Sequence, residues 1–274
     1  MSDFTIELNM AKKAAKSAAK IIRKFQKDSN FSIDFKGKND LVTEADVRAE
    51  EEILSVIEKE FPYDHILAEE SSVEQEMPEG RTWLIDPIDG TTNFAHGFPV
   101  YCVSIGLWEN CEPKMGLVLE VSGGECFTAI KDKGAYLNGN PISVSKIDNP
   151  ANALVGTGFP YNDLSLVDNY LQFFRMLMTN IQGVRRPGAA SYDLCCVASG
   201  RFEGFYEYAL NPWDVGAAAL IVQEAGGRVT DWSGGDDWLF GKRIIAGNPA
   251  VHAFLLDEIA NFFEVDEIKA KSKK

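Results

Sequence analysis

The chain has 274 residues, of which 45% are hydrophobic and 25% are charged, a composition that suits a globular protein with a substantial buried core. Its formal net charge of −14 disfavours binding to nucleic acid and to anionic membranes, because both carry negative charge. No apolar run in the sequence reaches the ~18 residues that a membrane span requires.

The N-terminal segment and the cysteines both favour a cytoplasmic protein. Residues 1–27 carry lysines spaced through a helical pattern, and they lack the compact apolar stretch and cleavage site of a signal peptide. The odd cysteine count and the absence of a C-x-x-C pattern favour reduced, mostly buried thiols at Cys102, Cys111, Cys126, Cys195 and Cys196. The three histidines show no ligand spacing, so a zinc site is not expected.

The first half of the chain is predicted to form two helices followed by a meander of short strands. Apolar residues recur at three- and four-residue steps from Ile6 to Phe25, which predicts a helix over residues 5–27. After a polar turn at residues 36–40, Thr43 precedes Asp46 in a capping-box pattern that opens a helix reaching residue 60. Apolar runs between turn residues then predict strands at residues 65–68, 82–85, 101–108, 115–121 and 126–130.

The second half of the chain is predicted to alternate between strands and helices. Strands are expected at residues 154–157, at 204–208 and around Ile244 and Ile245. Helices are expected at residues 164–180, 190–198, 214–225 and 250–263, and the third of these closes with a Gly-Gly pair. The tail from residue 269 is expected to fray. No repeat or linker is visible, so we predict one domain over residues 1–274, with halves at about 1–150 and 151–265.

The strongest of four acidic clusters occupies residues 83–94. An apolar strand runs into Asp86, the proline after it is expected to end the strand ladder, and Gly90 permits a sharp turn. Asp86 and Asp89 can point at one spot from such a turn, and the Ile88 carbonyl can turn toward the same spot. Hard oxygen ligands of this kind suit Mg²⁺. The alternative is an ordinary strand end, since aspartate, proline and glycine are common turn residues.

Three further acidic clusters each allow a functional and a structural interpretation. Glu69 ends an apolar run, where the alternative is a solvated acidic turn. Asp214 lies at a helix start, where capping of free N–H groups is the alternative. Asp46 lies in a first helical turn, where the helix dipole alone favours an acid. Four carboxylates brought together would repel one another, and two divalent cations roughly 4 Å apart relieve such repulsion and clamp a phosphoryl group. The four are Glu69, Asp86, Asp89 and Asp214.

These clusters resemble the signatures of the inositol monophosphatase family. Residues 86–94, Asp-Pro-Ile-Asp-Gly-Thr-Thr-Asn-Phe, match the signature turn of that family. Residues 213–217 through 224–227 match its C-terminal signature, and residues 41–46 and 69–71 match its two N-terminal ones. The resemblance covers residues 5–260 in the right order. It implies a layered α/β/α/β/α sandwich of the sugar-phosphatase type and Mg²⁺-dependent hydrolysis of a phosphate monoester.

The resemblance also implies a role for each residue that matches a family motif. One Mg²⁺ would be held by Glu69, Asp86 and the Ile88 carbonyl, a second by Asp86, Asp89 and Asp214, and a third, weaker ion would contact Glu69 through waters. The implied catalytic residues are Asp46, Thr91 and Glu69, with Thr91 and Asp46 positioning and deprotonating the attacking water. The implied substrate-binding residues are Gly90 and Thr91 as a phosphate cradle, Gly188, Ala190 and Glu207 facing the alcohol, and Asp214.

The implied activity is hydrolysis of inositol monophosphate to inositol and phosphate by a metal-activated water, with sensitivity to lithium. The expected partners are a small phosphorylated polyol and, since the family is commonly dimeric, a second copy of the chain. Alternatives on the same fold are phosphatases for fructose 1,6-bisphosphate, histidinol phosphate, NADP or phosphoadenosine phosphate. A non-catalytic protein that uses the metal site for structure or partner binding is disfavoured by the complete ligand set.

Two features of the second half have competing interpretations. Ser191 and Cys195 lie among small residues on a predicted helix, and we interpret them as packing residues. The pair Arg185-Arg186 can grip phosphate, but such a pair is more often a solvated or interface pair.

Overall fold

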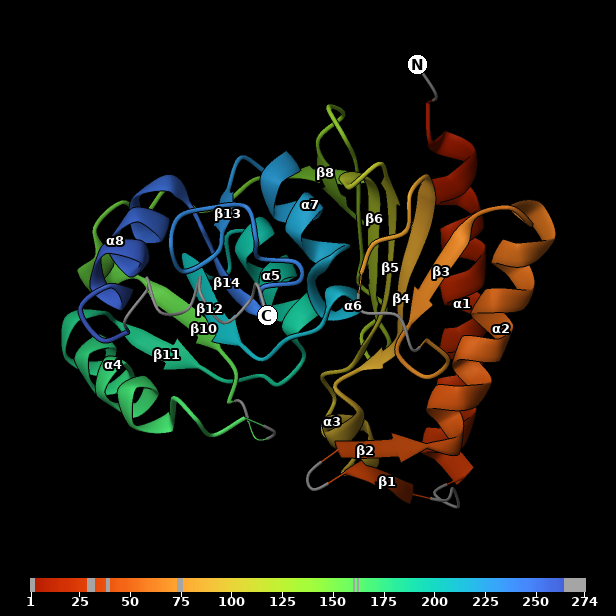
Figure 1. Cartoon of the computed structure of the whole chain (residues 1–274), viewed down its shortest axis with the longest axis horizontal. Coiled ribbons are helices and arrows are strands. Elements are labelled where there is room, and N and C mark those ends of the chain that lie inside the picture. The colour runs from red at the N-terminus through yellow and green to blue at the C-terminus, as the bar shows by residue number, and fades with distance from the viewer. Residues whose placement is uncertain are drawn as a thin grey trace.

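Helices and sheets alternate in five layers across the long axis of the molecule (Figure 1). The computed structural model describes residues 3–28, 33–37, 40–72, 76–159, 161 and 163–263, without the side chains of residues 33–37 and 40–42. From one side to the other, the order is helices, sheet, helices, sheet, helices (Figure 1). The chain therefore has the layered α/β/α/β/α architecture that the family resemblance implies. None of the helices in the described ranges combines the length and apolar character of a membrane span.

The N-terminal half supplies an outer helix layer and a seven-stranded sheet. Helices α1 (Thr5–Asp28) and α2 (Glu44–Glu60) cover the outer face of this sheet (Figure 1). The strands lie in chain order, and β3 pairs in parallel with β4 while all other neighbours are antiparallel. They are β3 (His65–Ala68), β4 (Arg81–Asp89), β5 (Cys102–Glu109), β6 (Glu112–Glu120), β7 (Cys126–Ile130), β8 (Ala135–Leu137) and β9 (Asn140–Ile142). A separate antiparallel pair, β1 (Ile33–Gly37) and β2 (Asp40–Thr43), precedes α2.

The C-terminal half supplies a five-stranded sheet and two helix layers. The strands lie in the order β11-β10-β12-β14-β13. They are β10 (Leu154–Thr157), β11 (Gly183–Arg185), β12 (Gly204–Tyr208), β13 (Arg228–Thr230) and β14 (Arg243–Gly247). The outer helices are α4 (Val167–Asn180) and α8 (Pro249–Ile259), and the middle layer holds α5 (Ala190–Ala198), α6 (Pro212–Val215) and α7 (Ala218–Glu224). Two short helices remain, α3 (Thr91–Ala95) and the 3₁₀ turn η1 (Pro150–Asn152).

Buried apolar side chains of the described residues form three cores between the five layers. The first core joins α1 and α2 to the seven-stranded sheet through side chains such as Ile22, Ile53 and Trp83. The second joins both sheets to the middle helices, and the third joins the five-stranded sheet to α4 and α8. Helices α5 and α7 lie between the two sheets, and most of their residues are buried. Their sequences are therefore rich in apolar residues on all sides of the helix.

Most predicted elements are confirmed, and the differences are local. The predicted helix over residues 214–225 is in fact two helices, α6 and α7, which are separated at Gly216 and Ala217. A Cβ at Gly216 would overlap Leu84, and the Gly216 carbonyl accepts a hydrogen bond from Trp108 Nε1 at 3.1 Å. The helices predicted at 164–180 and 250–263 are shorter than expected. Strands of three residues, such as β11 and β13, were not predicted. Residues 38–39 of the predicted polar turn, and the tail from residue 269, lie outside the described residues.

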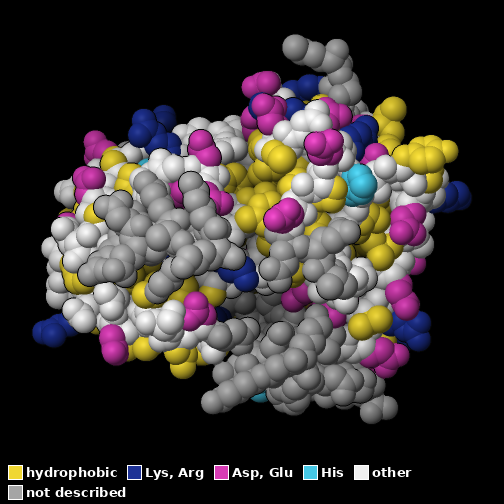
Figure 2. Space-filling view, viewed as in Figure 1, with side chains coloured by type: hydrophobic (Ala, Val, Ile, Leu, Met, Phe, Trp, Pro, Cys, Tyr) yellow, Lys and Arg dark blue, Asp and Glu magenta, His cyan; other side chains and the backbone are white. Residues whose placement is uncertain are grey.

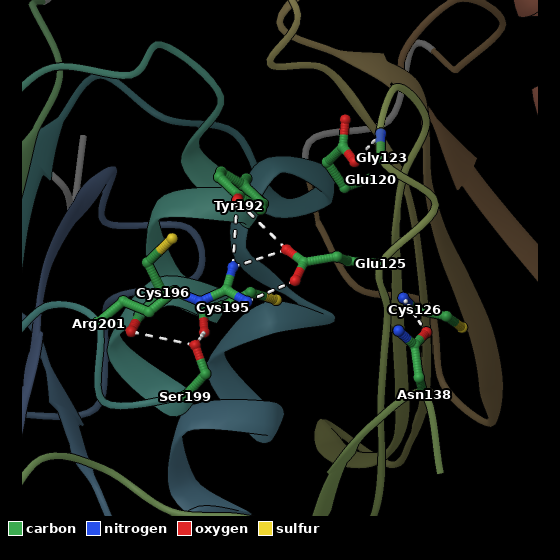
Figure 3. Close-up of polar contacts among 10 residues, drawn as sticks. All are labelled: Glu120, Gly123, Glu125, Cys126, Asn138, Tyr192, Cys195, Cys196, Ser199 and Arg201. Carbon is green, nitrogen blue, oxygen red and sulfur yellow. Dashed lines mark hydrogen bonds and ion pairs between the residues drawn. The ribbon is translucent and has the colours of Figure 1, made fainter. Parts of the chain in front are cut away.

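An ion pair connects the two halves of the chain. Figure 3 shows Arg201, which follows α5, pointing toward Glu125, which precedes β7. The two side chains make paired contacts of 2.5 and 2.6 Å, and Arg201 lowers the pKa of Glu125. Because both side chains are partly exposed, solvent screening limits the pair to about 1 kcal/mol.

The cysteines and the surface charge agree with expectation. All five cysteines are free thiols, and Cys102, Cys195 and Cys196 are buried, which confirms the prediction of reduced, mostly buried thiols. Cys195 and Cys196 lie close to the ion pair of Arg201 in Figure 3. Acidic side chains are spread over the face drawn in Figure 2 instead of gathering in one patch.

Candidate active site

A β-bulge in β4 turns Asp86 and Asp89 toward the same side of the sheet. Asp86 lies opposite Ser104 of β5, and Asp89 lies opposite Cys102, so three steps on β4 match two steps on β5. Side chains alternate along a regular strand, so two residues three positions apart would point to opposite faces. The extra residue of the bulge places both aspartates on the same face. The expectation that the proline ends the ladder is wrong, because β4 continues through the bulge to Asp89.

The residue after β4 adopts a backbone conformation that only glycine accepts readily. Gly90 has φ of +93°, and a Cβ at this position would lie 3.0 Å from the Val100 carbonyl oxygen. The turn starts the short helix α3, whose first residue is Thr91. Thr91 consequently lies next to the bulge and faces the same side as the aspartates.

Thr91 and Asp46 are in direct contact, although 45 positions separate them in the sequence. Thr91 Oγ1 lies 3.0 Å from Asp46 Oδ1 and 3.0 Å from the Ile88 carbonyl oxygen. The other carboxylate oxygen of Asp46 accepts hydrogen bonds from the backbone N–H and the hydroxyl of Thr43, at 2.8 and 2.5 Å. The predicted capping box at the start of α2 is therefore confirmed, and it fixes the Asp46 carboxylate beside Thr91.

Burial dominates the protonation of Asp46. The side chain is fully buried, and this burial raises its pKa to about 6. The hydrogen bonds from Thr43 and Thr91 lower the pKa, while the charge of Glu70 raises it. Asp46 is thus poised to exchange a proton near neutral pH.

Asp89 is held by the first turn of α5, at the opposite wall. Its Oδ2 accepts hydrogen bonds from the Ser191 N–H at 2.7 Å and the Ser191 hydroxyl at 2.5 Å, and its Oδ1 accepts from the Ala190 N–H at 3.1 Å. Burial raises the pKa of Asp89, and these hydrogen bonds oppose the rise. The interpretation of Ser191 as a packing residue is incomplete, because its hydroxyl binds one of the predicted metal ligands.

Asp214 reaches the same region from α6. Its Oδ2 accepts a hydrogen bond from the Asn211 N–H at 2.7 Å, in a capping box that starts this helix. Burial raises the pKa of Asp214 to about 7, and Asp89 adds to the rise. Gly116 of β6 brings the helix this close to the sheet, because a Cβ there would overlap the Ala217 backbone. Capping and ligand roles are thus compatible, since one oxygen caps and the other stays available.

Burial and three neighbouring acids oppose ionisation of the Asp86 carboxylate. Burial raises its pKa well above the usual range, and the charges of Glu69, Asp89 and Asp214 raise it further. Its Oδ1 is buried and accepts no hydrogen bond from any described residue. A buried anion with an unsatisfied oxygen among other acids is unfavourable unless a cation compensates.

One cavity of about 150 Å³ collects these residues. Of the predicted site residues, all but Asp46 line it, and Asp46 lies behind Thr91. The predicted residues at the wall are Glu69, Asp86, Ile88, Asp89, Gly90, Thr91, Gly188, Ala190, Glu207 and Asp214. Within the described part of the chain, no group of three or more His, Cys, Asp or Glu side chains forms a ready-made metal site. Mutual repulsion of uncompensated carboxylates opposes such convergence.

The far wall of the cavity comes from the C-terminal half. Glu207 of β12 lies against Gly158, where an added Cβ would overlap its carboxylate. Burial raises the pKa of Glu207 to about 8, while the charge of Arg186 lowers it and those of Asp214 and Asp89 raise it. Arg186 also lines the cavity, which favours the phosphate-grip interpretation of the Arg185-Arg186 pair for the second arginine alone.

Comparison with known proteins agrees with this architecture. The model of the inositol monophosphatase family matches residues 6–262. The chain belongs to that family. It is 42% identical over 254 residues to the putative Nus factor SuhB of Neisseria meningitidis serogroup B, which covers 92% of this chain and 97% of that protein. It is 44% identical over 221 residues to the inositol-1-monophosphatase of Synechocystis, which covers 81% and 77% of the respective chains.

Solved structures share the fold of this chain, among them the inositol monophosphatase from Anabaena (Nostoc) sp. PCC 7120, with a TM-score of 0.85 and 34% identity over 96% of this chain and 98% of that one. The extragenic suppressor protein suhB from Bartonella henselae matches with a TM-score of 0.89 and 35% identity, over 93% of this chain and 98% of that one. The names of family members that resemble this chain therefore include both phosphatases and Nus factors.

Some residues that line the cavity escaped the sequence-based interpretation. Gly158 and Leu210 line the cavity but lie outside the recognised motifs. The sequence marks these two positions only weakly, since Gly158 follows a short strand and Leu210 precedes the C-terminal signature. The hydrogen bonds between Asp89 and Ser191 span 102 positions and cannot be read from local pattern.

Proposed function

We propose that this chain hydrolyses phosphate monoesters of small polyols with the help of Mg²⁺, and that inositol monophosphate is its first substrate to test. The observation that carries the proposal is the buried Oδ1 of Asp86, which lies among three other acids and accepts no hydrogen bond from the residues that the structure describes. A hard divalent cation fits this donor set, because oxygen ligands with negative charge are the ones that Mg²⁺ prefers.

The bulged strand and the facing helices supply oxygen ligands for two to three ions. Glu69, Asp86 and the Ile88 carbonyl would hold one ion. Asp86, Asp89 and Asp214 would hold a second, and Glu69 would contact a third through water. When bound, these ions neutralise the charge of the phosphate and make a bound water a better nucleophile near neutral pH.

The chain's own residues orient that water and accept its proton. The Thr91 hydroxyl donates to Asp46 Oδ1 when Asp46 is ionised, so its lone pairs face the cavity and can accept a hydrogen bond from water. The proton then passes through the hydroxyl to Asp46. Thr43 holds the carboxylate of Asp46 in place throughout. No serine or cysteine nucleophile is needed.

The two walls divide the substrate between them. Gly90 and Thr91 bind the phosphate, in keeping with the family resemblance, while Glu207 and Gly188 face the alcohol. Ala190 also lines the cavity, but its N–H already donates to Asp89, so its side chain is the part that remains available to a substrate.

Phosphate release tests the proposal directly. Inositol 1-phosphate is incubated with the purified chain at several Mg²⁺ concentrations, with EDTA, and with lithium added to the Mg²⁺ reaction. We expect release that requires Mg²⁺ and that lithium inhibits. Absence of release from inositol 1-phosphate and from a panel of other phosphate monoesters at saturating Mg²⁺ would overturn the proposal.

The relatives named Nus factor SuhB raise a second possible role in partner binding. Such a role requires no buried carboxylate cluster, and the cluster here favours the phosphatase. The substrate panel includes fructose 1,6-bisphosphate, histidinol phosphate, NADP and phosphoadenosine phosphate, which are the alternatives on this fold. We propose a cytoplasmic homodimer, which light scattering of the purified chain and fractionation of the host cell test.

A further inference from the structure

Arg186 is a cation at the mouth of an otherwise acidic cavity. It follows β11 and lines the cavity together with Glu207. Its guanidinium carbon lies 5.8 Å from the ring centre of Phe159 and 5.4 Å from that of Tyr161. Two aromatic rings thus hold the guanidinium plane by cation–π contacts and leave its N–H groups available.

Within the part of the chain that the structure describes, the N–H donors of Arg186 remain available for a ligand. Among the described residues, no hydrogen bond and no ion pair within 4 Å engages its guanidinium, although Glu207 and Asp193 attract it over longer distances. The neighbouring Arg185 differs, because its Nη1 donates to the Val184 carbonyl at 2.9 Å and it does not line the cavity. A guanidinium carries five donors in a rigid fork that matches carboxylate and phosphate geometry.

Two glycines make room for the charged groups of this wall. A Cβ at Gly188 would overlap Arg186 Nη1, and a Cβ at Gly158 would overlap the Glu207 carboxylate. Both glycines line the cavity, so both charged groups lie directly against its backbone wall. Gly158 also leads into the segment that carries Phe159 and Tyr161, so one loop positions the carboxylate and the guanidinium together.

We propose that Arg186 is a specificity-determining residue that binds a second anionic group on the alcohol part of the substrate. This inference rests on the proposed phosphatase function, and it extends the substrate class to phosphate monoesters that carry another phosphate or a carboxylate. The scissile phosphate belongs at the opposite wall, beside Thr91 and the carboxylates. Arg186 lies on the wall that faces the alcohol, next to Glu207, where a second anion would otherwise meet only repulsion.

A pair of substrates that differ only in the second anion isolates this contact. Fructose 1,6-bisphosphate and fructose 1-phosphate are compared at saturating Mg²⁺ for the wild type, Arg186→Gln and the matched control Arg185→Gln. We expect Arg186→Gln to lower kcat/KM for the bisphosphate at least tenfold more than for the monophosphate. Arg185→Gln should leave the ratio of the two values within about twofold. Arg186→Lys keeps the charge but loses the fork and should give an intermediate ratio.

Each other outcome has a distinct meaning. Equal losses on both substrates, or no loss on either, overturn the inference while leaving the phosphatase intact. The same holds if the wild type cleaves inositol 1-phosphate but not the bisphosphate. A shift of Arg186→Gln to a smaller assembly in light scattering, with an unchanged substrate ratio, assigns Arg186 to an interface between copies instead. Absence of phosphate release by the wild type from every substrate overturns the proposed function itself. If Arg186→Gln does not fold, the ratio measured for Arg186→Lys decides.

Discussion

The two walls of the cavity differ in chemistry and in how they are built. The N-terminal wall is acidic and comes from one bulged strand, the helix turn after it and the start of α2. The C-terminal wall mixes Glu207, Arg186 and two glycines from three separate segments. The first wall is therefore assembled mainly by local geometry, whereas the second depends on the packing of distant segments.

This difference separates reaction chemistry from substrate choice. A bulge turns Asp86 and Asp89 to one face of β4, and a capping box orients Asp46 at the start of α2. Hydrogen bonds from α5 then hold Asp89, so this wall also depends on one long-range contact. The arrangement of Glu207 and Arg186 depends instead on Phe159, Tyr161 and Gly158, so a change in that loop can alter the substrate without touching the reaction.

The largest effect should come from Asp89→Asn on the acidic wall. The amide keeps an oxygen for the two hydrogen bonds from Ser191 and loses the bond from the Ala190 N–H, so the fold should survive with reduced stability. It removes a charged ligand, and we expect kcat/KM to fall by 10² or more, which is over ~2.7 kcal/mol of transition-state stabilisation. Steady-state kinetics with Mg²⁺ titration measure the loss.

Asp231→Asn is the matched control for that variant. Asp231 also accepts several backbone and hydroxyl hydrogen bonds, in the turn after β13, but it does not line the cavity. Its substitution should change thermal stability and leave kcat/KM near the wild-type value. Near-normal turnover by a folded Asp89→Asn protein would show that the acidic wall does not bind catalytic metal.

The next effect concerns the hydroxyl that links water to Asp46. Thr91→Ala should lower kcat on the order of 10²-fold while the Mg²⁺ concentration at half-maximal rate stays nearly constant, because the hydroxyl orients water and binds no ion. Thr91→Ser should recover much of the rate. Thr92→Ala, at the exposed neighbouring position, serves as control. A weakened response to Mg²⁺, with kcat retained at saturation, would assign Thr91 to metal binding instead.

A smaller, selective effect is expected on the C-terminal wall. If Glu207 binds hydroxyl donors, Glu207→Gln should raise KM for inositol 1-phosphate more than for an aryl phosphate without hydroxyls. The differential should be on the order of 1.5–3 kcal/mol when Glu207 is ionised. Because burial raises the pKa of Glu207 to about 8, the differential should be larger at pH 9 than at pH 7. Equal changes for both substrates would remove Glu207 from alcohol recognition.

The same contrast between the two walls explains which features of the site could be predicted from the sequence. Asp86, Ile88, Asp89 and Gly90 lie in one short motif whose residue types dictate their local geometry, so their meeting was predictable. The bulge that makes it possible was not, because the register of β4 against β5 is a property of two strands. Asp46 was predicted from a capping pattern, but its 3.0 Å contact with Thr91 depends on how α2 packs against the sheet.

The C-terminal wall was harder to predict from the sequence, for physical reasons. Strand β11, which carries the chain to Arg186, has only three residues and therefore no usable periodicity. The break between α6 and α7 falls at Gly216 and Ala217, and a Cβ at Gly216 would overlap Leu84 of the other sheet. Neither feature leaves a local pattern, and the family resemblance placed Glu207 and Gly188 only by their position in the chain.

The pH dependence of the rate should report the protonation of Asp46 on the acidic wall. Asp46 can accept a proton only when it is ionised, and burial raises its pKa to about 6. Once protonated, it donates to the Thr91 hydroxyl, which then loses a lone pair that the water needs. The rate at saturating Mg²⁺ should therefore be constant above this pKa and fall about tenfold for each pH unit below it. Saturating Mg²⁺ matters, because protons also compete for Asp214, whose pKa burial raises to about 7.

Glu70→Gln tests whether Asp46 is the group that titrates. The charge of Glu70 raises the pKa of Asp46, so removing it should move the acidic limb of the rate profile to lower pH. Glu70 lies next to a predicted metal ligand, and Mg²⁺ affinity is therefore measured alongside. Glu44→Gln, in the first turn of α2 at an exposed position, removes a charge of the same sign and should leave the limb in place. If Glu70→Gln leaves the limb unmoved with Mg²⁺ still saturating, a group other than Asp46 accepts the proton, and the acidic wall contains the metal site but not the base.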